Sequence, residues 1–419
     1  MTEVLSVGLY GKIVGYLTQT TKGQITFRFT AAYLSGPNRP VLSQSFEDNL
    51  SRTYSGQKHS LPPFFANLIP EPGTLRELIE KNLGVEPGDD LALLETVGRD
   101  LPGAVEVIRV DEEIFPSQDD QKMSAYMTEK SEDSLEAKTT GLRFSLAGVQ
   151  MKFSVLRDPE KIALPAHNQD GDWIVKLGSA RFPLVVQNEY AIMQWAKAAE
   201  FDVPECYIQD AKTVDFALKK QADFGDSVFV IRRYDRKLGK RIHQEDFAQI
   251  TSKKPSLKYD HLKYEQCAGL VKQLSGDDTY YEFIRRLTFM IASGNGDAHL
   301  KNWSCLYLDS RYPSLAPMYD QVCTIAWPEL DSTLALKLAG TKNFFALDIQ
   351  RFEELAKRAG ADPNKTAETV QETLSQLVET WNKSQVSNLL PSHHAQRLQD
   401  FWERVPLLRS FASNMERPG

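Results

Sequence analysis

The segment Ser293–Trp303 holds residues whose types and spacing could do chemistry. Asp297 and Asn302 lie five positions apart in it, after a stretch of helical character. In the catalytic loop of a phosphotransferase, an aspartate accepts the proton of the substrate hydroxyl, and an asparagine five residues later holds a magnesium ion. The spacing therefore predicts that Asp297 is the catalytic base and that Asn302 is a metal ligand.

Three further charged residues could complete a nucleotide site. Asp320 follows a short predicted hairpin, where a second ligand for Mg²⁺ belongs, and this ion prefers oxygen ligands. Lys176 ends an apolar run, where a point charge could reach the α- and β-phosphates of ATP. Glu189, on the next predicted helix, is the candidate to orient this lysine.

Each of these residues has an ordinary structural interpretation as well. Asp297 could cap a helix, Lys176 could extend from a strand end into solvent, and Asp320 could be an ordinary loop residue. Their order, with strands before and helices after, favours a kinase-like phosphotransferase. The chain lacks a full G-x-G-x-x-G loop and a G-x-x-x-x-G-K-[ST] motif, which argues against an ordinary protein kinase and a P-loop enzyme.

The composition indicates a folded protein of two or three domains, with 419 residues, 42% of them hydrophobic and 25% charged. A net charge of −7 argues against binding nucleic acid through global charge. The four cysteines are widely spaced, which predicts free thiols rather than a zinc ribbon or a disulfide scaffold. No signal peptide or membrane span is apparent, so we expect a cytoplasmic protein.

The elements that must position these residues fall into four parts. Short β-rich runs predict a meander over 4–29, and helical spacing predicts helices over 74–81 and from residue 89, which together form an N-terminal α+β subdomain over 1–110. Residues 111–141, with nine acidic and three basic side chains, form an acidic connection.

The rest of the chain divides near residue 250. Residues 142–250 are predicted to form the ATP-binding part of the N-lobe and the hinge, with strands near 142–146, 151–156, 173–177 and 228–232 and a helix over 188–199. Residues 251–419 are predicted to form a helical catalytic lobe. The expected fold is α+β, a two-lobed kinase-like body with a β-rich N-terminal lobe, a mostly helical C-terminal lobe and a cleft between them.

Several segments resemble the HipA-type serine/threonine kinase toxins of type II toxin–antitoxin systems. The resemblance runs in the same order over most of the chain and includes Phe64–Pro70, Gly98–Val105, Arg143–Lys152, Ile174–Lys176, Arg233–Arg236, His243–Asp246, Gly296–Asn302, Tyr319–Asp320 and Leu336–Gly340. It implies the kinase-like fold of that family, with Asp297 as the catalytic aspartate, Lys176 as the ATP lysine, and Asn302 and Asp320 at the magnesium positions.

The resemblance also implies residues around the nucleotide. The short phosphate loop corresponds to Ala147, Gly148, Val149, Gln150 and Lys152, and the adenine hinge lies near Arg232 and Tyr234. Arg232 stands where an acidic residue is expected, so nucleotide preference could differ. Ser145 falls at the autophosphorylation position, and a phosphate there adds about −1.5 to −2 charges, which should disfavour ATP binding.

By the same resemblance, the protein would use ATP and Mg²⁺ to phosphorylate a serine of a translation-related target, such as the glutamyl aminoacyl-tRNA synthetase, and so arrest growth. Its expected partner is a HipB-like helix-turn-helix antitoxin, which would carry the complex to operator DNA. Two alternatives stay open: a small-molecule or lipid kinase on the same scaffold, and a catalytically silent corepressor module.

Four other features receive a simpler interpretation. The basic stretches 232–241 and 253–259 are predicted to be mainly solvated faces, with an anion site as the alternative. His299, a secondary candidate together with Lys301, is expected to orient the loop by hydrogen bonding. The pair His393–His394 is expected in a solvated loop.

Overall fold

The computed structural model describes residues 3–110, 152–158, 161–163, 171–213, 225–260, 262–383 and 386–414. Several predictions lie outside the described residues: the acidic connection over 111–141, the strand over 142–146, Ser145, and the phosphate-loop residues Ala147, Gly148, Val149 and Gln150.

The N-terminal part is built on a five-stranded antiparallel sheet of order β4-β3-β2-β1-β5. Its strands are β1 (Glu3–Leu9), β2 (Lys12–Gln19), β3 (Gln24–Phe29), β4 (Tyr54–Lys58) and β5 (Val105–Arg109). The first three form the expected meander, because each pairs with the next in the chain. Leu5, Leu17 and Phe27 are fully buried on this sheet.

Short helices cover this sheet: α1 (Ala31–Ser35), α2 (Gln44–Glu47), α3 (Pro63–Ala66), α4 (Thr74–Leu83) and α5 (Asp90–Val97). Both predicted helices are present. α4 ends where Gly84 adopts the left-handed conformation that glycine tolerates best, with a φ of 68°. The side chain of Asp89 caps α5 by accepting a hydrogen bond from the Ala92 amide at 3.0 Å.

A second antiparallel sheet, of order β7-β6-β8-β10-β9, follows. It contains β6 (Lys152–Asp158), β7 (Lys161–Ala163), β8 (Trp173–Lys176), β9 (Cys206–Asp210) and β10 (Ser227–Arg232). The helix α7 (Val185–Ala198) packs against β9 and β10, in agreement with the predicted helix over 188–199. Its buried side chains include Ile192, Met193 and Trp195.

The C-terminal part is mostly helical, with α9 (Tyr264–Ala292), α10 (Ile349–Ala359), α11 (Pro363–Lys383), α12 (Ser392–Arg404) and α13 (Pro406–Ala412). α9 is kinked at Gly276, which has a φ of 85°. Three indoles hold α7, α11 and α12 together: the ring of Trp381 lies 4.8 Å from that of Trp195 and 5.0 Å from that of Trp402. Such a cluster buries a large apolar area.

Short elements join these parts. The strands are β11 (Arg236–Lys237), β12 (Lys240–Arg241), β13 (His243–Asp246), β14 (Ser304–Tyr307), β15 (Ser314–Leu315), β16 (Thr333–Leu338) and β17 (Thr341–Asn343). The helical turns are α8 (Phe247–Ile250), η2 (Ala211–Thr213), η4 (Pro255–Leu257), η5 (Leu300–Asn302), η6 (Thr324–Ala326), η7 (Phe344–Ala346) and η8 (Val386–Asn388). Among the described helices, none is both long and apolar enough to span a membrane.

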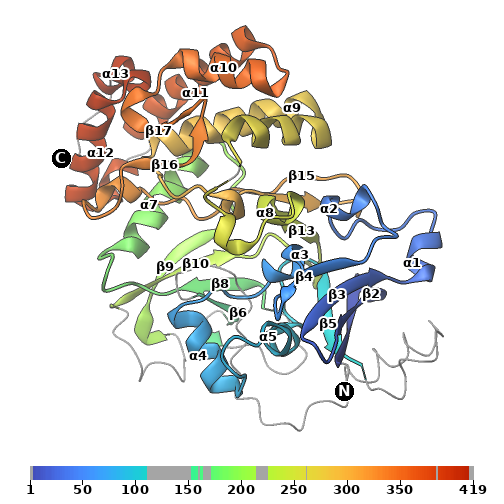
Figure 1. Cartoon of the computed structure of the whole chain (residues 1–419). Coiled ribbons are helices and arrows are strands. Elements are labelled where there is room, and N and C mark those ends of the chain that lie inside the picture. The colour runs from blue at the N-terminus through green and yellow to red at the C-terminus, as the bar shows by residue number, and fades with distance from the viewer. Residues whose placement is uncertain are drawn as a thin grey trace.

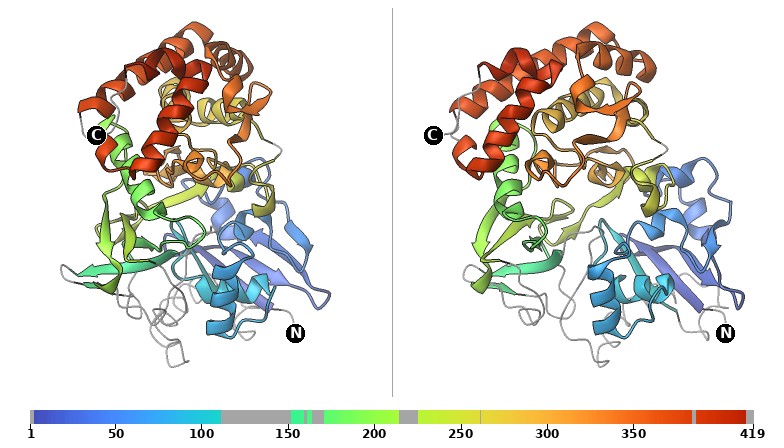
Figure 2. Two further views of the ribbon diagram at one scale, coloured as in Figure 1. Left: turned by 90° about the vertical axis from the view of Figure 1, so that its left-hand side faces the viewer. Right: turned by 60° about the vertical axis from the view of Figure 1, so that its left-hand side comes forward.

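Figure 1 shows the C-terminal helices, coloured yellow to red, at one end of the molecule and the N-terminal sheet, in blue, at the other. The turned views in Figure 2 show the same separation. The expected fold class is therefore confirmed: a mixed α and β protein with a strand-rich N-terminal part and a helical C-terminal part.

A buried ion-pair network joins the N-terminal part to the segment that follows β10. Arg233 binds Asp100 at 2.7 Å and Asp235 at 2.8 Å, and Arg236 binds Asp100 at 3.1 Å. The prediction of a solvated face over 232–241 is therefore wrong for Arg233 and Arg236. Asp100, which neutralises both arginines, lies more than 130 residues earlier in the chain, where a local charge pattern does not reveal it.

The prediction of a solvated loop at His393–His394 is also wrong. Both residues belong to α12, and His394 is buried, with its Nδ1 3.0 Å from the side-chain nitrogen of Asn188 on α7. Packing of α12 against α7 decides this burial.

Candidate active site

A cavity of about 1150 Å³ lies between the second sheet, the loop after α9 and the N-terminal part. The four side chains predicted to do the chemistry all line it, namely those of Lys176, Asp297, Asn302 and Asp320. They come from positions up to 144 residues apart in the sequence. The fold therefore brings together a lysine, two carboxylates and an amide at one cavity.

The loop that carries Asp297 begins where α9 ends at Ala292. Gly294 turns the chain with a φ of 66°, and the side chain of Asn295 accepts a hydrogen bond from the Asp297 amide at 2.9 Å. Asn302 closes the loop, because its side-chain nitrogen donates to the Asp297 carbonyl at 2.9 Å. The amide oxygen of Asn302 is then the atom that it can offer to a cation.

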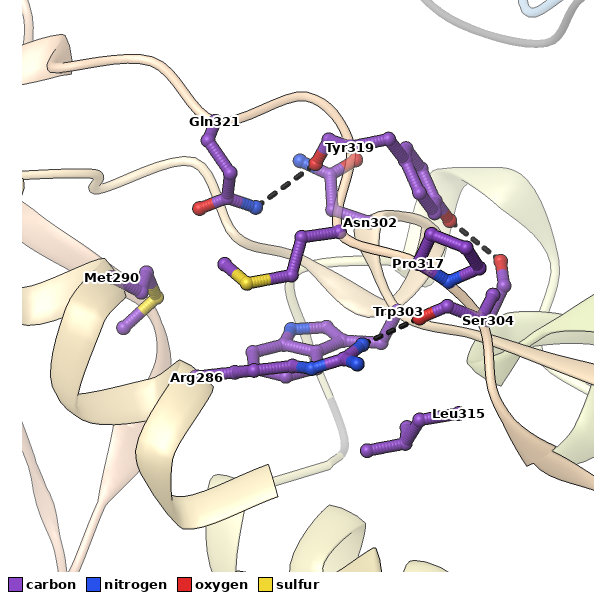
Figure 3. Close-up of a pocket in the computed structure, with 11 residues that line it drawn as sticks. Arg286, Met290, Asn302, Trp303, Ser304, Leu315, Pro317, Tyr319 and Gln321 are labelled. Carbon is purple, nitrogen blue, oxygen red and sulfur yellow. Dashed lines mark hydrogen bonds between the residues drawn. The ribbon is translucent and has the colours of Figure 1, made fainter. Parts of the chain in front are cut away.

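Hydrogen bonds brace the chain on both sides of Asp320, and Figure 3 shows those made by Ser304, Tyr319 and Gln321. The Tyr319 hydroxyl lies 2.5 Å from the Ser304 hydroxyl, and it donates to the Lys301 carbonyl at 2.8 Å. The side chain of Gln321 donates to the Tyr319 carbonyl at 2.9 Å, and Arg286 of α9 donates to the Ala316 carbonyl at 2.5 Å. The bond to Lys301 ties the Asp320 segment to the loop that carries Asp297, and the other bonds fix the conformation of the Asp320 segment.

Asp320 itself has a left-handed backbone, with a φ of 52°. Aspartate tolerates this conformation better than most residues, and such strain occurs often at functional sites. The turn brings the Asp320 carboxylate into contact with Lys176, while 24% of that side chain stays exposed to the cavity.

Lys176 is the last residue of β8 and is buried. Its Nζ lies 2.5 Å from Glu189 Oε1 on α7 and also binds the Asp320 carboxylate. Burial alone would lower the pKa of Lys176, but Asp320 and Glu189 outweigh it and hold the pKa above its ordinary value. The lysine is therefore charged, and the predicted pairing with Glu189 is present in the structure.

The Asp297 carboxylate faces the cavity and accepts a hydrogen bond from the Tyr259 hydroxyl at its Oδ1, at 2.5 Å. Poor solvation between the cavity walls raises the pKa of Asp297 above its ordinary value, although the hydrogen bond from Tyr259 opposes this. Sequence reasoning missed Tyr259, which it treated as the end of a basic stretch.

The loop-orienting role predicted for the His299 side chain stays a prediction. Among the described residues, its Nδ1 has no hydrogen-bond partner, and its ring lies edge-on to that of Tyr259 with centroids 4.9 Å apart. Burial, with help from the cations Lys258 and Lys301, lowers the pKa of His299 to about 3. The imidazole is therefore neutral, and it lines the cavity.

Glu71, from the N-terminal part, reaches the same cavity and was not found from the sequence. Its carboxylate lies 2.9 Å from Lys258 and 3.2 Å from Lys301. Lys258 is buried, so the prediction of a solvated face over 253–259 is wrong at this position. A carboxylate almost 190 residues away along the chain explains the burial.

The two residues predicted to form the adenine hinge, Arg232 and Tyr234, line the same cavity. The Tyr234 hydroxyl donates to the Gln244 side chain at 2.5 Å, and the Tyr234 ring lies 5.6 Å from that of Tyr319. Arg232 is exposed at the end of β10 and lines the cavity. Lys152 begins β6 and pairs through its backbone with Lys176, next to the predicted phosphate loop.

Comparison with known proteins agrees with this architecture. The HipA N-terminal domain model matches residues 5–108, and the HipA-like C-terminal domain model matches residues 144–381. A Sinorhizobium fredii protein provisionally named as the kinase Y4dM is 36% identical over 98% of both chains. The serine/threonine-protein kinase toxin HipA of Shewanella oneidensis is 24% identical over 68% of both chains.

Among solved structures, the fold is similar to that in the Shewanella oneidensis complex of HipA, HipB and operator DNA. The TM-score is 0.72 at 20% identity, covering 97% of this chain and 99% of the other. With the two domain models matched in order and the cavity residues in place, the chain belongs to the HipA family of kinase toxins.

Proposed function

We propose that this protein is a kinase toxin that transfers the γ-phosphate of ATP to a serine of a protein. The observation that carries the proposal is the meeting of Lys176, Asp297, Asn302 and Asp320 at one cavity in a member of the HipA family. In this assignment, Lys176 binds the α- and β-phosphates, and Asp297 accepts the proton of the attacking hydroxyl.

The residues present fit a magnesium ion. Asn302 uses its side-chain nitrogen within the loop, so its oxygen is left for a cation, and the Asp320 carboxylate is partly exposed at the same cavity. Magnesium prefers such oxygen donors, and when bound it would neutralise charge on the phosphoryl oxygens. Within the described residues, no cluster of three or more His, Cys, Asp or Glu could hold a metal, so we expect the phosphates of ATP to supply the remaining ligands.

The finer parts of the proposal follow from family membership. We infer a translation-related target, with the glutamyl-tRNA synthetase as the first to test, and autophosphorylation at Ser145. The solved complex of a related HipA with HipB and operator DNA supports a HipB-like antitoxin and operon co-repression here as well. We further propose a cytoplasmic location and domain boundaries near residues 110, 141 and 250.

Intact-mass spectrometry after incubation with Mg-ATP tests the proposal. The wild type should gain one phosphate, and both Ser145→Ala and Asp297→Asn should gain none. Asp309→Asn, which changes an exposed aspartate of the β14–β15 hairpin, is the matched control and should behave as wild type.

The same samples are then mixed with glutamyl-tRNA synthetase. Transfer by Ser145→Ala but not by Asp297→Asn would separate the catalytic role from the modification site. Transfer to small alcohols instead of either protein would favour a small-molecule kinase. If no variant binds ATP while the antitoxin still binds, the silent corepressor alternative replaces the proposal.

A further inference from the structure

Tyr259 places a hydroxyl group on the carboxylate that is proposed to bind the acceptor hydroxyl. It lies in the loop between η4 and α9, and its O–H donates to Asp297 Oδ1 at 2.5 Å. A general base must be within about 2.6–3.2 Å of the hydroxyl that it deprotonates. The phenol thus makes the contact that a serine hydroxyl would make with this oxygen.

The backbone around Tyr259 is held on both sides. Lys342 donates to the Tyr259 carbonyl at 3.2 Å, and the Leu300 amide donates to the Lys258 carbonyl at 3.2 Å. Lys258 is in turn fixed by its ion pair with Glu71. This part of the loop is therefore tied to the catalytic loop, to β17 and to the N-terminal part.

The side chain is held much less firmly than the backbone. Tyr259 is 37% exposed. Among the described residues, its ring forms a T-shaped pair with that of His299 and lies 5.4 Å from the ammonium of Lys258. Rotation about χ1 would move the phenol toward solvent without disturbing the backbone, and exposed side chains change rotamer within nanoseconds.

We propose that Tyr259 is a specificity-determining residue that occupies Asp297 Oδ1 until a protein acceptor displaces it, and so keeps water from that oxygen of the base. The proposal rests on the kinase function proposed above. An acceptor serine, held by the rest of the target protein, has binding energy with which to displace the phenol, whereas a single water molecule has little.

The reaction that this contact would suppress is ATP hydrolysis. A water oxygen forms a bond to the γ-phosphorus, the bond from that phosphorus to the β–γ bridging oxygen breaks, and the water proton passes to Asp297, leaving ADP and phosphate. The phenol itself stays protonated, because burial and the charge of Asp297 raise the pKa of Tyr259 above its ordinary value.

The test is phosphate release from Mg-ATP without an acceptor, in wild type and Tyr259→Phe. General-base assistance is worth roughly 10²–10⁴-fold, so even partial access of water to Asp297 should raise hydrolysis about ten-fold in the variant. The KM for ATP should not change, because the phenol contacts the acceptor side. Adding Asp297→Asn to Tyr259→Phe should abolish the gain.

Tyr264→Phe is the matched control. Its hydroxyl donates to the Ala298 carbonyl at 3.1 Å, so this variant also loses a tyrosine hydrogen bond to the catalytic loop, but not one to Asp297. It should hydrolyse ATP at the wild-type rate. An equal rise in Tyr264→Phe would mean that loosening the loop causes the gain, and it would overturn the proposal.

Two other results would also overturn it. One is unchanged or slower ATP hydrolysis in Tyr259→Phe, which would show that the phenol does not exclude water. If wild type binds ATP and phosphorylates protein normally in the same experiment, the kinase function stays intact. A phosphate found on Tyr259 by peptide mass spectrometry would make it an acceptor instead. If wild type does not bind ATP at all, the kinase function itself is refuted. A direct measurement of ATP binding distinguishes this outcome from the two others.

Discussion

At the scale of single residues, the informative group is Lys176, a buried cation held by two carboxylates from different elements. Glu189 lies on α7 and is fully buried, whereas Asp320 lies in a loop and is partly exposed. Removing the lysine would therefore affect the two carboxylates differently. Glu189 would lose its cation in the core, while water could reach Asp320.

We predict that Lys176→Met loses protein phosphorylation and unfolds more easily. Removing one partner of a buried ion pair costs about 3–5 kcal/mol, because the other charge is left uncompensated. Phosphotransfer assays and urea unfolding would measure the two losses. Lys197→Met, on the exposed side of α7, is the control.

The double variant Lys176→Met/Glu189→Leu separates the two roles of the lysine. Replacing both charges by apolar side chains removes the buried unpaired carboxylate, so the free energy of unfolding should recover. Phosphotransfer should stay lost, because no cation faces the phosphates. Recovery of activity together with stability would show that Lys176 acts only in folding.

At the scale of elements, α7 links Lys176 to the loop that carries Asp320. Asn188, one residue before Glu189, accepts a hydrogen bond from the Cys323 amide at 2.8 Å, and its nitrogen lies 3.0 Å from His394 Nδ1. One turn of α7 thus orients Lys176 through Glu189 and supports the chain just after Asp320. A shift of this helix would therefore change both of the proposed nucleotide contacts together.

We therefore predict that Asn188→Ala raises the KM for Mg-ATP and destabilises the protein. The Cys323 amide would be left buried without its partner, which costs about 1–3 kcal/mol. Steady-state kinetics and thermal unfolding would check this. Gln187→Ala, the neighbouring position on the same helix, should change neither, and an unaltered KM in Asn188→Ala would contradict the proposed link.

At the scale of the whole molecule, buried polar groups join the N-terminal part to the segment after β10 and to β13. Asp100 neutralises Arg233 and Arg236, and the Gly103 amide donates to Asp235 at 2.8 Å.

We predict that Asp100→Asn destabilises the fold by about 3–5 kcal/mol, because two buried guanidinium groups lose a counter-charge. Denaturant unfolding would measure it, with Asp226→Asn at the exposed start of β10 as control; equal stability of the two variants would refute the prediction.

A second buried contact between the same parts depends on pH. Glu245 of β13 accepts hydrogen bonds from the Ser43 hydroxyl at 2.6 Å and the Gln44 amide at 3.0 Å. Burial raises the pKa of Glu245 to about 7, although the bonds from Ser43 and Tyr307 oppose the shift. The folded state then binds this proton more tightly than the unfolded state, so its contribution is fully present below about pH 4.5 and is lost as the pH rises through 7.

Glu245→Gln should remove this pH dependence. A shift from 4.5 to about 7 corresponds to about 3 kcal/mol, so the loss of stability between pH 5 and pH 8 should be smaller in the variant by an amount of that order. Urea unfolding across this range would show it. An identical slope in variant and wild type would mean that Glu245 titrates normally in the folded protein.

Much of the local structure was predictable from the sequence. Strand alternation and turn residues located β1–β3, β8 and β10, and Gly84 and Asp89 marked a helix end and a helix start. These features depend on neighbours within a few residues, so a local pattern carries them. Lys176, Asp297, Asn302 and Asp320 were identified in the same way, since their spacing is a property of the chain.

Contacts between distant segments could not be predicted this way. The sequence around Lys258 or Arg233 is the same whether its side chain is solvated or buried. Lys258 is buried because Glu71 pairs with it, and Arg233 because Asp100 does, and both carboxylates come from the N-terminal part. The same holds for His394, which is buried because α12 packs on α7.

The sequence by itself therefore determined which chemical groups are available, in which order, and on what kind of element each lies. Only the tertiary structure decided that Glu189 rather than solvent faces Lys176, that Glu71 pairs with Lys301 at the cavity, and that the Tyr259 hydroxyl donates to Asp297. The physical reason is that local conformation depends on near neighbours, whereas burial and the pairing of charges depend on which surfaces the completed fold brings together.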